Sequence, residues 1–347
     1  MSAYDGTERI GPFDVVSVLG NGGMGKVFLC RTPAGQRVAV KVIRGELADI
    51  HEIRERFARE VTALLDVHSP YTVPVYAAET VTPPLWLATR YVAGPTLEAR
   101  VVREGPLSAR QVAEIGAMLA EALSEVHAHG VIHRDVKPSN IILESGEPRL
   151  IDFGIARTAA GRKGLTLPGT ALGTHGYMAP EQLLGRDPTP AVDMFALGSV
   201  LAYAATGRPP FGTGQPASIR ILRRRPPRLT GVPAPLATLI ADCLATAPGE
   251  RPLPAEVMAA LGALLAPVPG PVSGPVSGPV PVSGPGESAA ARPRQRTVPV
   301  PDPPHRCHVP AAPGAGDPCA LRPFATRLLH AGLTCSLVRK AALHHDR

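Results

Sequence analysis

The sequence predicts an α+β protein with a small β-rich region, a larger helical region and a tail that cannot build a core. Three observations support this. Runs of β-branched residues concentrate before Val92, helical periodicity follows from Gly94 to Ala266, and a proline-rich repeat begins at Pro267. The 347 residues, 44% of them hydrophobic, suffice for one large or two small cores.

The first region should contain four strands and one helix. Its apolar runs are rich in valine and isoleucine, and the segment RTPAGQ between two of them supplies turn residues. A charged run with helical periodicity follows them. The strands are expected over 13–19, 26–30, 37–43 and 84–92, and the helix over 46–67.

The second region should be mainly helical. Ser108 is a good N-cap, apolar residues follow it at helical spacing, and Gly130 occupies the position that a C-terminal glycine prefers. The run 192–207 is almost continuously apolar, as in a helix buried on most sides. Two further helices are expected over 235–245 and 255–266, and a strand over 148–154.

The tail carries most of the excess positive charge. Up to Ala266 the sequence has 27 Lys and Arg against 25 Asp and Glu, whereas the rest has 9 against 4. Frequent prolines predict an extended linker over 267–304, and the basic segment 305–347 has no predicted structure. Dispersed cations without interleaved aromatic residues predict no specific nucleic-acid partner.

Cysteine usage and hydropathy indicate a cytoplasmic protein. The five cysteines form no CxxC pair, which fits a reducing compartment better than a disulfide framework. The N-terminal segment MSAYDGTERIGPF lacks the basic and apolar parts of a signal peptide. No uninterrupted apolar window of about 18 residues occurs, so no membrane span is predicted.

A glycine-rich segment lies between the first two expected strands. Gly20, Gly22 and Gly25 have the spacing G-x-G-x-x-G, which also marks dinucleotide-binding turns. A dinucleotide fold would place a helix after the glycines, whereas a strand-like run follows here. The glycines therefore belong to a hairpin whose backbone N–H groups can approach phosphate oxygens.

Lys41 lies in the strand VAVK, and Glu60 lies in the charged helix that follows. Taken alone, Lys41 is a solvent-facing strand residue. Glu60 taken alone is an exposed carboxylate that pairs locally with Arg54, Arg56 or Arg59. The alternative is an ion pair between Glu60 and Lys41 that holds the ammonium group against the phosphates of a nucleotide.

Two later segments supply the groups that phosphoryl transfer needs. In HRDVKPSN, Asp135, Lys137 and Asn140 place a carboxylate, a cation and an amide oxygen within one loop, and Asp152 adds a second carboxylate. A carboxylate can accept the proton of an attacking hydroxyl, a cation can contact the transferred phosphate, and oxygen ligands can hold Mg²⁺.

These motifs identify a resemblance. HRDxKPxN, DFG and APE, in this order, resemble the bacterial eukaryotic-type (Hanks-type) Ser/Thr protein kinases from about Ile10 to Ala266. The resemblance implies a bilobal protein-kinase fold, with an N-lobe over about 10–92 and a C-lobe over about 93–266. It also implies ATP as phosphate donor, Mg²⁺ or Mn²⁺ as cofactor, and proteins as substrates.

The same resemblance implies roles for individual residues. Asp135 would be the catalytic base, Lys137 the γ-phosphate contact, and Asn140 and Asp152 the metal ligands. Lys41 and Glu60 would form the activating ion pair. Thr89 would be the gatekeeper residue, and 90–92 the hinge that contacts adenine through its backbone. The implied ATP-binding residues are Leu19, Gly20, Asn21, Gly22, Gly23, Met24, Gly25, Val27, Ala39, Lys41, Thr89, Arg90, Tyr91 and Val92.

One position departs from the family pattern. Arg90 stands where an acidic residue is common, which puts contacts on the ribose side of the site in doubt but leaves adenine binding intact.

Further motifs lie in the second lobe. The Ser/Thr substrate class is indicated by Lys137, two residues after Asp135, and by Thr174. By resemblance, Glu181 pairs with Arg251, Asp193 braces the catalytic loop, and Thr174 contacts the catalytic Asp and Lys, as in Ser/Thr-directed kinases. The alternatives are a catalytically silent scaffold, which should lack catalytic residues, and a small-molecule phosphotransferase, which needs no APE segment for docking a peptide.

Regulation and the fate of the tail are further expectations. Arg134, next to the catalytic base, would bind a phosphate on Thr166 or Thr170 after autophosphorylation, which a kinase–kinase dimer could perform. Related kinases often continue through a proline-rich stretch into a membrane helix. This chain is therefore either a soluble member or carries a truncated or frame-altered remnant after about Glu287.

Overall fold

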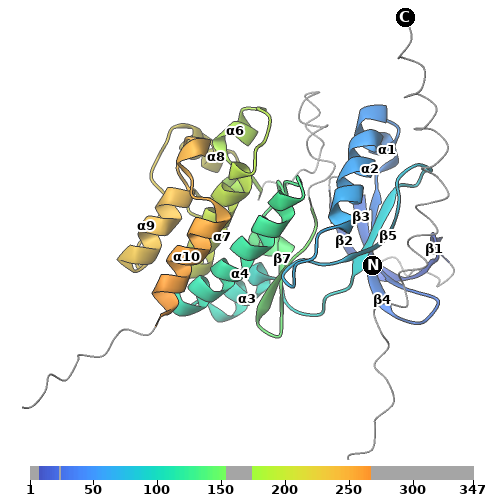
Figure 1. Ribbon diagram of the computed structural model, residues 1–347, viewed down its shortest axis with the longest axis horizontal. Helices are drawn as coiled ribbons and strands as arrows, with labels where there is room; N and C mark the ends of the chain where they lie inside the picture. Colours follow the sequence, from blue (N-terminus) through green and yellow to red (C-terminus); the bar gives the residue numbers. More distant parts are fainter. Residues whose placement is uncertain (1–7, 23–24, 154–173, 267–347) are drawn as a thin grey trace, which may run out of the picture. The chain divides into compact units, whose positions relative to one another are not determined.

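A computed structural model describes residues 8–22, 25–153 and 174–266 (Figure 1). The expectations for Gly23, Met24, Thr166 and Thr170 lie outside the described residues, as do those for the linker and the tail. No helix in the described ranges is long and apolar enough to cross a membrane.

The first lobe contains a six-stranded antiparallel sheet with the strand order β1-β2-β3-β4-β6-β5. Four of its strands overlap the predicted ones, while β1 and β5 were not predicted. Each residue of β5 is half-buried, so this strand lacks the alternation that marks a strand in sequence. The strands are β1 (Arg9–Ile10), β2 (Phe13–Gly22), β3 (Gly25–Arg31), β4 (Arg37–Ile43), β5 (Val75–Glu79) and β6 (Trp86–Arg90).

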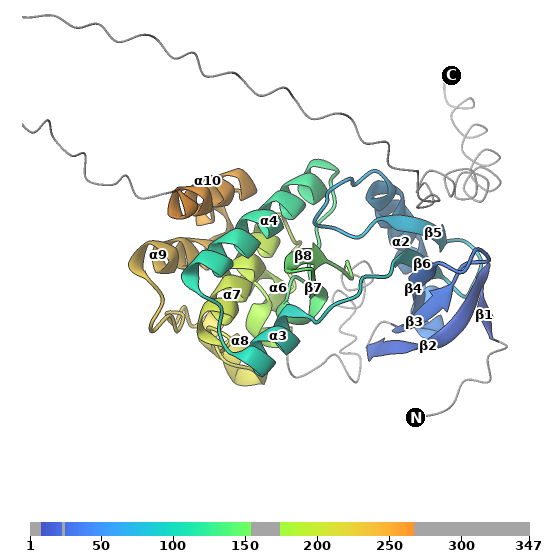
Figure 2. The same ribbon diagram turned by 90° about the horizontal axis from the view of Figure 1, so that it is seen from below.

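The helix predicted over 46–67 is two helices, α1 (Gly45–Ala48) and α2 (His51–Leu65). They are separate because Ile50 adopts an extended conformation, with φ −84° and ψ 113°. The apolar face of α2 is buried in one cluster with residues of β6, and Figure 2 shows α2 beside the strands. The buried residues of α2 are Ile53, Phe57, Val61 and Leu64.

Where it is described, the second lobe is helical apart from one hairpin. Helices predicted over 108–130, 192–207, 235–245 and 255–266 are present within one or two residues, whereas α3, α6 and α8 were not predicted. The helices are α3 (Leu97–Glu104), α4 (Ala109–Ala128), α6 (Pro180–Leu183), α7 (Ala191–Thr206), α8 (Gly214–Leu222), α9 (Ala234–Cys243) and α10 (Pro254–Leu265). The hairpin strands are β7 (Ile141–Glu144) and β8 (Glu147–Leu150).

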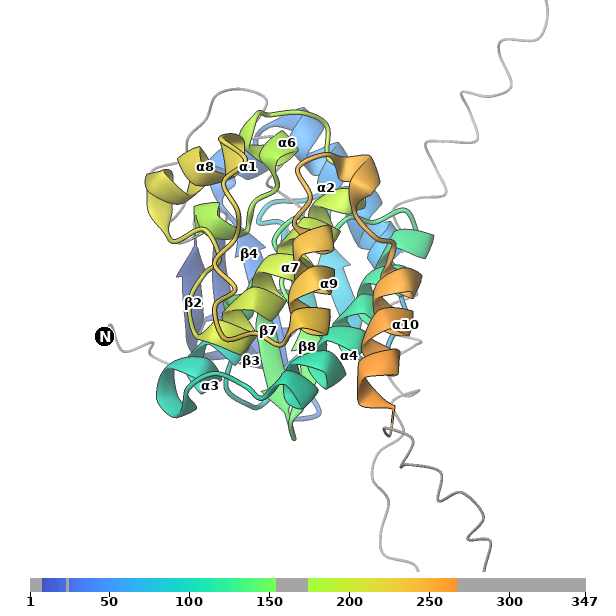
Figure 3. The same cartoon turned by 90° about the vertical axis from the view of Figure 1, so that its left-hand side faces the viewer.

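The core of the second lobe is built around α7. Every residue of α7 from Val192 to Ala204 is buried, as its continuous apolar sequence predicts. Phe195 of α7 stacks on Phe211 with 5.8 Å between ring centroids, and α4, α9 and α10 contribute to the same core. Figure 3 shows α9 and α10 beside α7. This core supports the segment between α4 and β7, which carries the catalytic motifs.

Each lobe also buries one free thiol. Cys30 in β3 and Cys243 at the end of α9 are fully buried. Burial raises the pKa of Cys30 to about 11 and that of Cys243 to about 12. Both side chains therefore act as small apolar core residues.

Candidate active site

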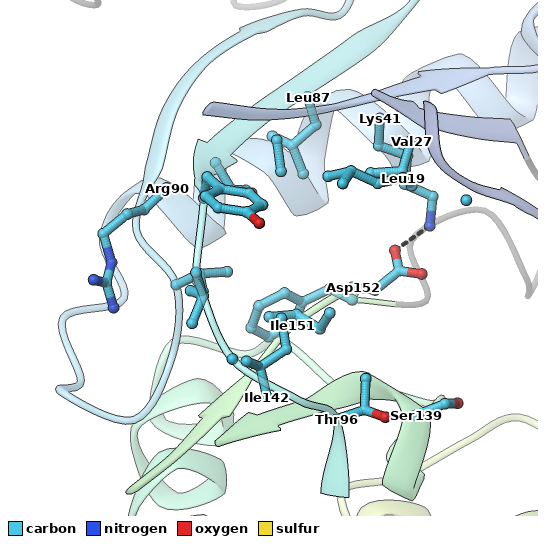
Figure 4. A pocket seen from close by; sticks show the side chains of 18 of the residues that line it. Leu19, Val27, Lys41, Leu87, Arg90, Thr96, Ser139, Ile142, Ile151 and Asp152 are labelled. Atoms are coloured by element: carbon cyan, nitrogen blue, oxygen red, sulfur yellow. Dashed lines mark hydrogen bonds and ion pairs between the residues drawn. The ribbon is translucent and has the colours of Figure 1, made fainter. Parts of the chain in front are cut away.

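A cavity of about 420 Å³ opens between the sheet of the first lobe and the hairpin of the second (Figure 4). The charged pair Lys41 and Asp152 lies at one end of it, and the segment 90–92 lies at the other. The ATP-binding residues predicted from sequence that line it are Leu19, Gly20, Val27, Ala39, Lys41, Thr89, Arg90, Tyr91 and Val92.

The three described glycines of the G-x-G-x-x-G segment have different surroundings. Gly20 lines the cavity, and a Cβ there would meet nothing within 4 Å. Gly25 lies against β4, where a Cβ would be 1.9 Å from the carbonyl oxygen of Val42. A side chain at position 25 would thus collide with β4, whereas a Cβ at position 20 would point into open space beside the cavity. Asn21, Gly22 and Gly25 are not among the lining residues.

Sequence reasoning missed half of the lining. Ile142 of β7 and Ile151, next to Asp152, lie below the cavity in Figure 4 and supply its apolar floor. Their positions carried a signal: Ile142 follows Asn140 by two residues, and Ile151 directly precedes Asp152. The remaining missed residues are Ile43, Phe57, Val73, Leu87, Gly94, Thr96, Ser139 and Phe153.

Arg90 extends away from the cavity, as Figure 4 shows. Its guanidinium donates two hydrogen bonds to the carboxylate of Glu144, at 2.9 and 2.8 Å. Glu144 also accepts a hydrogen bond of 2.9 Å from Arg149. The hydrogen bonds from Arg90 hold the pKa of Glu144 below its usual value, and those from Arg149 act in the same direction. The arginine at this position therefore ties β6 to the β7–β8 hairpin.

The catalytic loop brings together three of the predicted residues. Lys137 Nζ donates to Asp135 Oδ2 at 2.9 Å. Asn140 Nδ2 donates to the Asp135 carbonyl at 2.9 Å and to its Oδ2 at 3.1 Å. These contacts hold the Asp135 carboxylate in a fixed orientation beside a cation.

Asp193, at the start of α7, is fully buried and binds the backbone of this loop. Its two carboxylate oxygens accept hydrogen bonds from the N–H groups of His133 and Arg134, both at 2.8 Å. His127 Nε2 lies 2.8 Å from the same carboxylate. Arg134 has a left-handed backbone with φ 63°, a strained conformation that these bonds stabilise. Asp193 therefore sets the path of the chain into Asp135.

His133 connects the loop to the segment after β8 that carries Asp152. Its Nε2 lies 3.1 Å from the Ile151 carbonyl, and its Nδ1 lies 3.3 Å from the Asp135 N–H. A neutral ring with the proton on Nε2 satisfies both contacts. Burial lowers the pKa of His133, which also favours the neutral ring. The ring lies 4.7 Å from that of Phe153, centroid to centroid.

The ion pair expected between Lys41 and Glu60 is not formed in this structure. Lys41 instead pairs with Asp152, and Glu60 pairs with Arg134 (Figure 4 for the first pair). Glu60 is also not exposed, since only 15% of its side chain is accessible. The reason is local charge, because Arg134 approaches Glu60 from the catalytic loop while Lys41 has a second carboxylate within reach.

The surroundings of Glu60 contain more positive than negative charge. Burial raises the pKa of Glu60, while Arg134, Arg56 and Arg59 act in the opposite direction. In the described part of the chain, Arg56 Nη1 and Arg134 Nε are buried donors without a hydrogen-bond partner. Three guanidinium groups therefore surround one carboxylate, and some of their N–H groups have no hydrogen-bond acceptor.

Glu181 and Arg251, which the sequence resemblance pairs, lie together in the second lobe. Arg251 donates to the two carboxylate oxygens of Glu181 at 2.6 and 2.9 Å, and both residues are buried. Arg251 also donates to the Ala191 carbonyl at 2.8 Å. This fixes the segment after residue 174 on α7. Thr174 begins the 3₁₀ turn η2 (Thr174–Tyr177), and its predicted contact with the catalytic residues stays a prediction.

Asn140 and Asp152 offer a suitable donor set for Mg²⁺. The amide nitrogen of Asn140 is used toward Asp135, so its amide oxygen is the atom that can ligate a cation. Asp152 adds a carboxylate at the mouth of the cavity. Mg²⁺ typically takes one or two protein oxygens and completes its shell with substrate phosphates and water. The described residues contain no cluster of three or more His, Cys, Asp or Glu side chains that could hold a metal ion.

The chain matches the family model "Protein kinase domain" over residues 13–260. The chain belongs to the protein kinase family. It is of the bacterial Hanks type, since it is 45% identical over 255 residues to the serine/threonine-protein kinase AfsK of Streptomyces coelicolor. That match covers 73% of this chain and 32% of AfsK.

Other relatives and a solved structure agree. The probable serine/threonine-protein kinase PkwA of Thermomonospora curvata is 45% identical over 254 residues, which are 73% of this chain and 34% of PkwA. This chain thus spans about a third of the length of these relatives. The crystal structure of the Mycobacterium tuberculosis PknI kinase domain matches with a TM-score of 0.62 and 29% identity, over 75% of this chain and 98% of that domain. The bilobal fold expected from the sequence is confirmed.

Proposed function

We propose that this chain is an ATP-dependent kinase that phosphorylates Ser and Thr hydroxyls of proteins in bacterial signalling. The observation that carries the proposal is the arrangement of Asp135, Lys137 and Asn140, which a buried carboxylate and a neutral histidine hold in place next to a cavity of suitable size for a nucleotide. A scaffold would have no need for this complete set.

The proposed reaction assigns one task to each group. The adenine lies between the apolar side chains of the two lobes and contacts the backbone of 90–92. Asp135 orients the acceptor hydroxyl and takes its proton as the new O–P bond forms and the bond to the β-phosphate oxygen breaks, which leaves ADP. Lys137 and Lys41 contact phosphate oxygens, where they stabilise the charge of the transition state.

A divalent cation fits the same site. Asn140 and Asp152 would hold it, and when bound it supplies charge neutralisation between the β- and γ-phosphates. For Asp152 to serve this ion fully, Lys41 must exchange its carboxylate partner. Glu60 of α2 can form an ion pair with Lys41 once the ion pair between Glu60 and Arg134 is broken.

Activation-segment phosphorylation would supply that release. A phosphate on Thr166 or Thr170 presents up to two negative charges and three acceptor oxygens, and guanidinium groups bind it with charge-assisted hydrogen bonds. Arg134 Nε and Arg56 Nη1 are buried donors available to it. Once phosphate binds Arg134, Glu60 can pair with Lys41. A second copy of the chain would transfer the phosphate in this scheme.

The compartment follows from the same chemistry. ATP as donor and two buried, unpaired thiols suit the cytoplasm, as the cysteine pattern of the whole chain also predicts.

Intact-mass spectrometry tests the proposal. The purified full chain is incubated with Mg²⁺ and ATP beside its Asp152→Asn variant. We expect additions of about 80 Da per phosphate in the parent and none in the variant. Fragment masses should place phosphate on Thr166 or Thr170. Nucleotide binding without any transfer to the chain or to a protein substrate would favour a scaffold instead.

The activation step has its own test. The double variant Thr166→Ala, Thr170→Ala should lose most of the rate that the parent gains after incubation with ATP. An unchanged rate would exclude the proposed release of Glu60 by phosphate, while leaving the kinase activity itself in place.

A further inference from the structure

A dense group of arginines lies at the C-terminal end of α8. Residues 194–241 contain six arginines and no aspartate or glutamate. Five of the six are exposed, and four of these five lie close together in sequence. No carboxylate in the described ranges pairs with any of these four. We call these four the α8 arginine patch: Arg223, Arg224, Arg225 and Arg228.

The backbone under the patch holds an arginine where glycine is favoured. Arg224 has φ 54°, its N–H donates to the Ile221 carbonyl at 2.9 Å, and the Arg225 N–H donates to the Arg220 carbonyl at 3.0 Å. This pair of bonds is the common helix-ending motif, whose left-handed position is usually glycine. α7 ends with Gly207 in the left-handed conformation, at φ 71°. An arginine at this position weakens the fold, so stability does not explain it.

Stabilisation of α8 by cations near its C-terminal dipole explains only a small part of the patch. Cations stabilise a helix within its last turn, and the effect falls off beyond it. α8 ends at Leu222, with Arg223 as its C-cap. Arg225 and Arg228 lie past the end of the helix. The charge of the patch is therefore available to a ligand.

The patch has a fixed position relative to the segment that should contact substrate. α8 packs against α6 and η2, and Figures 1 and 3 show α6 beside α8. η2 approaches the chain just before the start of α8, since a Cβ on Gly176 would lie 2.4 Å from the Gly212 carbonyl oxygen, and the patch lies at the other end of this helix, roughly 13 Å along its axis. η2 begins at Thr174, the residue predicted to contact the catalytic Asp and Lys. A protein bound near Thr174 would thus reach the patch with a neighbouring part of its chain.

The surface next to the patch is aliphatic. Ile219 and Leu222 of α8 are 46% and 42% exposed. Residues 219–228 contain no aromatic side chain, whereas proteins that bind single-stranded nucleic acid use aromatic rings to stack on bases. Exposed arginines beside aliphatic side chains suit an acidic peptide segment with interspersed apolar residues.

We propose that the α8 arginine patch binds an acidic segment of the protein substrate, away from the residues beside the acceptor hydroxyl. The inference rests on the proposed kinase function. The patch raises the local concentration of acidic substrates and so selects among proteins that share an acceptor sequence.

The test compares two synthetic peptides with the full chain. Both carry the same Thr acceptor segment, one extended by a run of glutamates and the other by glutamines. We expect KM for the glutamate peptide to be about tenfold lower, with equal kcat, because several exposed ion pairs add modest increments. The difference should shrink at high salt.

Three variants assign the effect to the patch. Arg223→Gln, Arg225→Gln, Arg228→Gln should bring the two KM values to within about twofold and leave kinetics on the glutamine peptide unchanged. Arg103→Gln, Arg110→Gln, Arg208→Gln removes the same charge from other exposed positions and should preserve the preference. Arg224→Gly should weaken the preference without lowering the melting temperature, because glycine suits this backbone.

Three outcomes would overturn the proposal. The parent could show the same KM for the two peptides, or both triple variants could lose the KM difference equally. The third outcome is that oligothymidylate displaces the glutamate peptide at a lower concentration than a second acidic peptide does. If neither peptide is phosphorylated at all, the proposed kinase function fails. Fluorescence anisotropy of a labelled glutamate peptide then still tests whether the patch binds acidic peptides. The proposal requires that this peptide bind more weakly to the patch variant than to the control variant.

Discussion

The two sides of the active site are held by different kinds of contact. On the side of the second lobe, backbone N–H groups of His133 and Arg134 bind the buried carboxylate of Asp193. On the side of the first lobe, the ion pairs that Lys41 and Glu60 form among the described residues are with charged groups of the other lobe, Asp152 and Arg134. Backbone bonds to a buried group break only when the loop unfolds, whereas ion pairs can exchange partners. Folding therefore builds the catalytic loop, and charge sets the position of Lys41 and Glu60.

The largest effect should come from the base itself. Asp135→Asn keeps the hydrogen-bonding shape of the side chain and removes its capacity to take a proton. We expect kcat to fall by roughly 10²–10⁴ with the KM for ATP and the melting temperature little changed. Steady-state kinetics on a Thr peptide measure this. A fall of less than tenfold would mean that proton acceptance by Asp135 is not required.

Asp193→Ala should damage both fold and activity. It leaves two buried backbone donors unpaired, so we expect a loss of about 3 kcal/mol in unfolding free energy and at least a hundredfold loss of activity. Urea denaturation and peptide phosphorylation measure the two effects. Asp242→Ala, an exposed acid on α9, is the control and should stay within about 0.5 kcal/mol. Similar stability of the two variants would remove the contrast between the two sides of the site.

Glu60→Gln should separate the two sides most clearly. Before phosphorylation of the chain we expect little change in activity, because Glu60 is bound to Arg134. After incubation with ATP we expect at least tenfold lower kcat than in the parent, since Lys41 then lacks its new partner. The rate is measured before and after the incubation. A variant that gains activity as the parent does would show that Lys41 keeps Asp152 throughout.

The smallest effect concerns Glu144, which links the lobes outside the cavity. Its pKa is lowered by Arg90 and Arg149, so its contribution to stability is present above its ordinary pKa of 4.5 and is lost as the pH falls through the lowered value. Glu144→Gln should therefore cost about 1 kcal/mol at pH 7 and less than that at pH 3. Urea unfolding at both pH values measures it.

A control for this pH dependence lies in the same hairpin. Glu147 is 52% exposed and pairs only with Arg149, so Glu147→Gln should change stability less at every pH. Equal effects of the two substitutions would show that the tie to Arg90 adds nothing.

Local sequence patterns predicted most of the elements around the site. Ser108 does form a capping box with Gln111, and the apolar run of α7 is buried as expected. The expected proximity of Asp135, Lys137 and Asn140 is also present, because HRDVKPSN places the three residues within one short loop. The half-buried strand β5, and the helices α3 and α8, lacked a strong pattern.

The partner of Glu60 could not be predicted in this way. Arg134 is 74 residues away in sequence and belongs to the other lobe, and local reasoning offered Arg54, Arg56 and Arg59 instead. The same holds for Arg90, whose unusual charge is explained only by Glu144, 54 residues away. Pairings between distant charged groups depend on the assembled fold, which spacing along the chain does not encode.

The two buried thiols provide a way to follow each lobe separately. Cys30 and Cys243 react with a maleimide only after their surroundings open, because the thiolate is the nucleophile and burial suppresses it. With Cys307, Cys319 and Cys335 replaced by serine, the two labelling rates report separately on the opening of the first and the second lobe. ATP, which should bind in the cavity beside β3, should lower the labelling rate of Cys30 and leave that of Cys243 nearly unchanged.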